Sequence, residues 1–233
     1  MSFQDKVTQY TLSTITDVTG LTQWLTQGAK HITDLLSDDR VKKFAVSVAV
    51  DSANGLDVSG YRLSYVHVNG YEARPIDAGQ RALNQDPDSI HFAIARSPVY
   101  YFDTGKLYVL PLGTNGTLSA MPYPTVLYSD ATITHFPSEL EDAVVLYAAI
   151  RVVTSQVKAL SLTIASIASP IYTDFSTAIA DEDIELAASF LDKIKTTIQE
   201  YSQDIQKAIS QIDGDLKTIQ ELKDLYKEEL SKL

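Results

Sequence analysis

The first regular pattern of apolar positions in the chain is helical. In the segment "TGLTQWLTQGAKHITDLLSD", apolar side chains recur at spacings of three and four residues, which places them on one face of a helix. The pattern predicts a helix from Thr19 to Ser37, with Thr19 as its N-cap. The residues of this face are Leu21, Trp24, Leu25, Ile32, Leu35 and Leu36.

Residues 41–133 change to the alternation that is typical of strands. "FAVSVAV" predicts a strand, and "YRLSYVHVNGYEARPI" predicts a hairpin that turns at Asn69-Gly70. A second hairpin is expected in "PVYYFDTGKLYVLP", with its loop at 103–105, and one or two helical turns are expected in "IDAGQRALNQD". We expect "PLGTNGTLSAMPYPT" to be exposed and rich in turns, and "TVLYSDATI" to add a last strand.

A nearly all-apolar helix follows this region. Ser138 and Glu141 have the spacing of a capping box, and the helix is expected to run to about Ile167, before a break at Ser169-Pro170. Its small residues allow close packing, and so wide an apolar surface must be covered by the β region, by a second helix or by a neighbouring subunit. The candidate interface residues on this helix are Ala143, Leu146, Tyr147 and Ile150.

The last part of the chain, from Asp181 to Lys232, has the seven-residue pattern of a coiled coil. After Gly214 the seam is expected to shift to Leu216 and Ile219, then to Leu222 and Tyr226. A kink or break is predicted at Gly214 because glycine disfavours a helix interior. An intermolecular contact through this arm and a helix folded back on its own domain are both consistent with the pattern. The candidate interface residues are Leu191, Ile194, Ile198, Tyr201, Ile205, Ile212 and Ile219.

Together these elements predict an α+β fold, in which helices pack with a small antiparallel β region and a long C-terminal helical arm extends the chain. The expected division is a core domain at 1–168 and the arm at 169–233. The chain has 233 residues, no cysteine and a net charge of −11. It therefore lacks the basic balance of a nucleic-acid-binding protein and cannot form a thiolate metal site.

The sequence predicts neither a targeting segment nor a membrane span. The N-terminus is polar and Thr-rich, unlike a signal peptide, and the longest apolar run, 143–150, is far shorter than the roughly 18 residues that span a bilayer. We expect synthesis in the cytosol and no membrane partner.

No catalytic motif emerges from the sequence. The histidines at 31, 67, 91 and 135 have no metal-binding spacing, and the D-T-G at 103–105 is better explained as a hairpin turn than as half of a protease dyad. We expect no enzyme activity, no metal and no cofactor. The alternative is a metal-dependent or small-molecule enzyme with a helical tail, which requires clustered carboxylates or histidines in one cavity; His67, His91 and Asp103 are the residues whose substitution tests it.

Three segments resemble the virion structural proteins of tailed bacteriophages, in particular the neck proteins known as head–tail connectors or adaptors. They are "LTQWLTQGAKHITDLL", "YYFDTGKLYVLP" and "ITHFPSELEDAVVLYAAIRVVTSQ", and the resemblance covers roughly residues 20–160. It implies a non-enzymatic homo-oligomeric ring, commonly of twelve copies, formed by the core domain. Such a ring contacts the portal protein and other neck or tail proteins, and double-stranded DNA passes through it without sequence-specific binding.

The expected location is therefore the neck or tail region of a virion, after synthesis in the host cytoplasm. A tail-completion or baseplate protein that oligomerises through its helical arm is the alternative within the same class.

Overall fold

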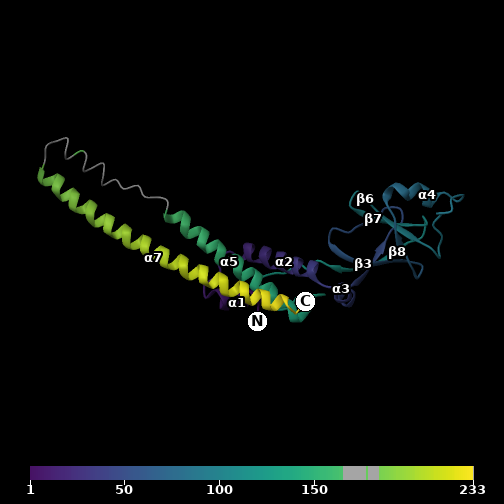
Figure 1. Ribbon diagram of the computed structural model, residues 1–233, viewed down its shortest axis with the longest axis horizontal. Helices are drawn as coiled ribbons and strands as arrows, with labels where there is room; N and C mark the ends of the chain where they lie inside the picture. The colour runs from purple at the N-terminus through teal and green to yellow at the C-terminus, as the bar shows by residue number, and fades with distance from the viewer. Residues whose placement is uncertain (165–176, 178–183, 233) are drawn as a thin grey trace.

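The computed structural model describes residues 1–164, 177 and 184–232 and has an α+β fold. The molecule is elongated: a pair of long helices forms one end, a β region forms the other, and most of the shorter helices lie between them (Figure 1).

Helices α1 (Phe3–Thr11), α2 (Val18–Leu35), α5 (Glu141–Ile164) and part of α7 (Ile184–Leu230) form a helical body. Helix α5 lies at its centre, because α1, α2 and α7 all pack against it. This explains why α5 is apolar on most of its faces. The main core cluster includes Phe3, Val7, Leu21, Leu25, Ile32, Leu140, Val144, Val145, Ala148, Ala149, Ile219 and Leu222.

Helices α2 and α5 approach closely at Gly28. A Cβ atom at this position would lie 2.9 Å from Cδ1 of Tyr147, so any side chain would push the two helices apart. Gly28 therefore lies on the buried face of α2, at the point where the ring of Tyr147 needs the space.

The β region consists of two four-stranded sheets. One has the order β1 (Val46–Val50), β8 (Gly116–Pro122), β3 (Tyr61–Val68) and β4 (Tyr71–Glu72), and all its pairs are antiparallel. The other has the order β2 (Leu56–Asp57), β7 (Lys106–Leu110), β6 (Val99–Asp103) and β5 (Arg74–Pro75), in which β5 and β6 are parallel. Both sheets contribute to one apolar cluster, which contains Val50, Val66, Val68, Leu107, Val109, Leu118 and Ala120.

Short helices complete the β region and join it to the body. Helix η1 (Ala78–Gln80) and α4 (Arg81–Gln85) lie at the outer end of the molecule, and α3 (Asp38–Phe44) lies between α2 and the sheets (Figure 1).

Both predicted hairpins are confirmed. Asn69 and Gly70 have φ of 52° and 80°, as a type I′ turn requires, and β3 pairs with β4 on either side. Thr104 and Gly105 make the corresponding turn between β6 and β7, with φ of 49° and 79°.

Two expectations for residues 111–133 are wrong. Residues 116–122 are not an exposed loop but the strand β8, which pairs with both β1 and β3 and is mostly buried. Residues 124–133 form no strand. The glycines and prolines around β8 hid the alternation of Leu118 and Ala120, whose side chains face the other sheet.

The helix starts differ from those expected. Asp17 caps α2 in place of Thr19, since its Oδ1 accepts the Gly20 N–H at 2.8 Å. Ser138 makes no capping bond in η2 (Ser138–Leu140), and the buried Glu141 instead accepts the N–H of Ile133 at 2.8 Å. A true capping box pairs Ser2 with Asp5 at the start of α1, a helix that the sequence analysis missed.

Helix α7 runs without interruption through Gly214, so the helix does not break there as the sequence analysis allowed. The 47 residues extend over about 70 Å at 1.5 Å per residue. Residues of its second half, such as Ile219 and Leu222, belong to the core of the helical body. This core therefore contains residues on both sides of the predicted boundary at 168/169. The expected end of α5 at Ile167, the break at Ser169-Pro170 and the start of the arm at Asp181 lie outside the described residues.

Candidate functional site: an apolar stripe on the long helix

The apolar residues of α7 form two separate stripes. Ile194, Tyr201, Ala208, Ile212, Ile219, Leu222 and Tyr226 are buried or half-buried. Leu191, Ile198, Ile205, Ile209 and Leu216 are exposed. At 3.6 residues per turn, the centres of the two stripes are about 70° apart around the helix. The single predicted seam therefore combines residues of both.

The buried stripe holds α7 against α5. Ile219 and Leu222 belong to the core of the body, and Tyr226 packs beside them. The rings of Tyr226 and Tyr147 on α5 lie with centroids 6.2 Å apart. Burial raises the pKa of Tyr226 to about 12, and the nearby Tyr147 adds to this shift. The C-terminal half of the arm thus folds back on its own domain, as one of the two sequence hypotheses proposed.

The buried stripe keeps its seven-residue period across Gly214. The half-buried Asp215 takes the position between Ile212 and Ile219 where an apolar residue would continue the pattern. The expected shift of the seam to Leu216 is therefore wrong: Leu216 belongs to the other stripe, where its side chain is 52% exposed.

The exposed stripe is straight and long. Its five residues follow spacings of 7, 7, 4 and 7, which confines them to about 40° of the helix circumference over about 38 Å. The exposed fractions lie between 36% and 52%. Five branched aliphatic side chains in one line on a helix are typical of a protein–protein contact.

Helix α7 reaches far beyond the described part of α5. The 24 residues of α5 cover about half the length of the 47-residue α7. The two helices are antiparallel, with the C-terminal end of α7 beside the start of α5 (Figure 1). Arg40 on α3 fixes this end: its Nη2 donates to the carbonyl oxygen of Lys232 at 2.7 Å, and its Nη1 lies 3.6 Å from Glu139.

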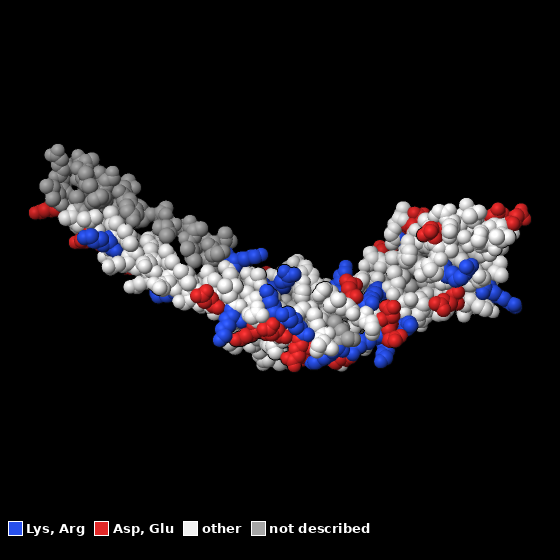
Figure 2. Space-filling view, in the orientation of Figure 1, with Lys and Arg blue, Asp and Glu red and all other residues white. Residues whose placement is uncertain are grey.

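Charges nearly balance along the projecting part of α7. Residues 184–212 carry four carboxylates and three lysines. Two of these lysines pair within the helix, Lys195 with Asp192 and Lys207 with Asp204, each at 3.4 Å. On the face drawn in Figure 2, this part of the helix is mostly white, with scattered charged groups, whereas the middle of the molecule is densely charged.

The four candidate residues of α5 contact this chain's own core. Ala143 and Leu146 are buried, and Ile150 packs against the main cluster. The ring of Tyr147 lies near His31 of α2 and Tyr226 of α7, and its hydroxyl accepts a hydrogen bond from Arg151 at 3.0 Å. Their apolar surface is thus covered within the chain.

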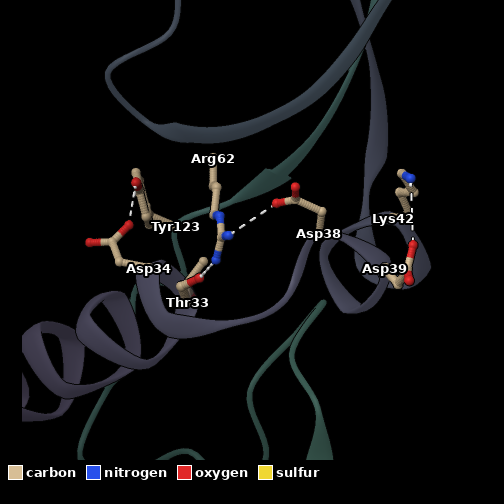
Figure 3. Close-up of polar contacts among 7 residues, drawn as sticks. All are labelled: Thr33, Asp34, Asp38, Asp39, Lys42, Arg62 and Tyr123. Carbon is tan, nitrogen blue, oxygen red and sulfur yellow. Dashed lines mark hydrogen bonds and ion pairs between the residues drawn. The ribbon is translucent and has the colours of Figure 1, made fainter. Parts of the chain in front are cut away.

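A group of polar contacts joins the β region to the helical body (Figure 3). Arg62 on β3 donates through Nη1 to the carbonyl oxygen of Thr33 at the end of α2, and its Nη2 lies 3.4 Å from Asp38 of α3. Tyr123, directly after β8, donates to Asp34 with an Oη–Oδ1 distance of 2.6 Å. We call Arg62, Thr33, Asp38, Tyr123 and Asp34 the joint, because they link two strands to two helices.

The environment of Tyr123 favours its neutral form. Partial burial, followed by the hydrogen bond to Asp34 and the negative charge of that carboxylate, raises the pKa of Tyr123 to about 12. Lys30 lies over the other side of the ring, 4.8 Å from its centroid.

The residues of the enzyme alternative do not meet. His67 lines a cleft of about 530 Å³ between α3 and β3, and His91 lines a different cleft of about 250 Å³ beside β5 and α4. Asp103 lies at the β6–β7 hairpin and lines neither cleft. Within 1–164, 177 and 184–232, no three His, Asp or Glu side chains gather as a metal site requires.

No helix in the described part of the chain combines the length and the apolar character that crossing a bilayer demands. The sequence analysis also missed Ile209 as a member of the exposed stripe. The signal was present, because the spacing of seven between Leu191, Ile198 and Ile205 recurs between Ile209 and Leu216.

No protein-family model matches the chain, and no curated protein matches it.

Proposed function

We propose that this protein is a non-enzymatic structural component of a tailed-phage virion, which assembles through α7 into a ring at the neck between portal and tail. The exposed stripe of α7 carries the proposal, because an aliphatic line about 38 Å long requires a protein surface to cover it. The resemblance of residues 20–160 to neck proteins supplies the biological setting.

The shape of the molecule is compatible with this role. A subunit of a ring must contact its neighbours and also the layers above and below it. The projecting half of α7 and the β region lie at opposite ends of the chain (Figure 1), so each can contact a different protein. The joint at Arg62 and Tyr123 holds the two ends in a defined orientation.

The acidic character of the chain supports the passage of DNA through such a ring. A net charge of −11 repels phosphate groups, so DNA would pass through the channel without stable binding. In this proposal the portal protein and other neck or tail proteins are partners, and DNA is a transient occupant.

A tail-completion or baseplate protein is the second candidate. It would use the same stripe, since an apolar line on a helix also suits the trimeric and hexameric assemblies of a tail. The number of copies per virion separates the two: twelve at the portal, against three or six in the tail.

The test is localisation and counting in purified virions. Quantitative mass spectrometry and cryo-electron microscopy should find the chain in about the copy number of the portal protein, directly beneath it. Its absence from virions would contradict the proposal, and three or six copies within the tail would favour the second candidate.

A further inference from the structure

The exposed stripe of α7 lies beside the face of the helix that packs within this chain. One face of the helix packs on α5 through Ile219, Leu222 and Tyr226. The exposed stripe runs about 70° further around the same helix and extends toward its N-terminal end. A second helix laid along this stripe would form, together with α5 and α7, a three-helix arrangement.

The charges around the stripe favour a second copy of α7 over a strongly charged partner. A chain of net charge −11 repels its own copies over most of its surface. Residues 184–212, with four carboxylates and three lysines, are nearly neutral. Ser202 and Gln206, which flank the stripe, are uncharged, and Lys195 is already paired with Asp192. Like helices can therefore approach here without repulsion, and no excess charge selects an acidic or basic partner.

The side chains of the stripe also suit self-pairing. Leu191, Ile198 and Ile205 are separated by whole heptads, so in a parallel pair each of them faces its own copy. Subunits of a ring point the same way, which requires parallel arms. A parallel pair of identical stripes has two-fold symmetry, so it joins copies two by two, and the ring closes through a second surface.

We infer that the exposed stripe pairs with the same stripe of a second copy in parallel register, so that Leu191, Ile198 and Ile205 each contact their own counterparts. This inference rests on the proposed assembly role and names the partner of the stripe. The pairing covers only about three heptads, so the isolated contact is weak and gains strength when many copies are held in one ring.

The absence of native cysteine makes a direct test possible in the full chain. Single variants Leu191→Cys, Ile198→Cys and Ile205→Cys are oxidised and examined on non-reducing gels. A parallel pair brings identical positions within disulfide distance, so each variant should form covalent dimers on its own. Gln203→Cys, an exposed residue on the far side of the same helix, is the matched control and should stay largely monomeric.

Two results would overturn the inference. The first is a dimer yield no greater than that of Gln203→Cys at all three positions. The second is cross-linking only when Leu191→Cys is mixed with Ile205→Cys, which indicates antiparallel helices. All the changed side chains are exposed, and circular dichroism confirms that each variant is folded. Neither result affects the neck proposal, which depends on finding the chain in virions. A failure of the cross-linking test can therefore be told apart from a failure of the neck proposal.

Discussion

Tyr123 donates a hydrogen bond to Asp34 across the joint between the β region and the helical body, with an oxygen–oxygen distance of 2.6 Å. The contact requires the phenol to keep its proton. The pKa of Tyr123 is about 12 in the folded chain, whereas an unfolded tyrosine titrates near 10. A raised tyrosine pKa stabilises the fold fully below pH ~10, and this contribution is lost as the pH rises through the folded value.

We therefore predict that the free energy of unfolding falls between about pH 10 and pH 12. Tyr226, whose pKa is also raised to about 12, contributes to the same fall. Tyr123→Phe should show a shallower decline, because the contribution of Tyr123 is missing while those of the other tyrosines with raised pKa values remain. Urea unfolding at several pH values measures this, and equal slopes in both proteins would refute the role of Tyr123.

Arg62 should matter more to the joint than its surface position suggests. Its guanidinium donates to the carbonyl oxygen of Thr33 and lies 3.4 Å from Asp38. Arg62→Ala should lower the free energy of unfolding by about 1–3 kcal/mol, since it removes the charged donor from that carbonyl oxygen, which keeps only the N–H of Leu36 at 3.3 Å. It should also widen the distribution of distances in small-angle X-ray scattering, as the β region loses its fixed orientation.

Lys42→Ala is the matched control for this change. Lys42 lies beside the joint on α3 and pairs only with the highly exposed Asp39, at 3.5 Å (Figure 3). Loss of such a surface pair costs about 0–1 kcal/mol. If the two variants have the same stability and the same scattering curve, Arg62 does not hold the joint.

Gly214 tests the continuity of α7. It lies within the helix, and nothing is found within 4 Å of the position that a Cβ atom would take. Gly214→Ala should raise the free energy of unfolding by about 0.5–1 kcal/mol, because alanine favours a helix and restricts the unfolded chain. A loss of stability in thermal unfolding would indicate that the helix bends at this residue.

Leu222 and Leu225 provide a matched pair on α7. Leu222 is 3% exposed within the core, whereas Leu225, one turn away on another face, is 44% exposed. Leu222→Ala should cost about 2–5 kcal/mol through the cavity it leaves, against less than about 0.5 kcal/mol for Leu225→Ala. Equal costs in chemical unfolding would show that the second half of α7 does not pack on the body.

The sequence predicts well those elements whose signals are local. The Asn69-Gly70 turn and the apolar face of α2 follow from residues a few positions apart, and both are present. Strand β8 was missed because its burial depends on partners some 50 to 70 residues away, β1 and β3. Glu141 likewise fits a capping box by spacing, but its carboxylate satisfies the N–H of Ile133 in the preceding loop.

The candidate site shows the same limit. The heptad pattern places Ile198 and Ile219 in one seam, yet in the fold Ile219 is buried against the body and Ile198 is 52% exposed. Spacing along a helix fixes the direction of a side chain but not the element that covers it. In the fold, the face of α7 that carries Ile194 and Ile219 is covered, whereas the face about 70° away that carries Ile198 is exposed.

The central claim is that the exposed stripe of α7 makes this chain associate. Sedimentation velocity of the full chain and of the double variant Ile198→Asp/Ile205→Asp tests it most directly. The wild type should sediment as species larger than its 25.6 kDa monomer. The double variant should sediment as a monomer with unchanged helix content, because it introduces charge on the stripe but none into the core. A wild type that is monomeric at every concentration, or a double variant that associates as the wild type does, would contradict the account.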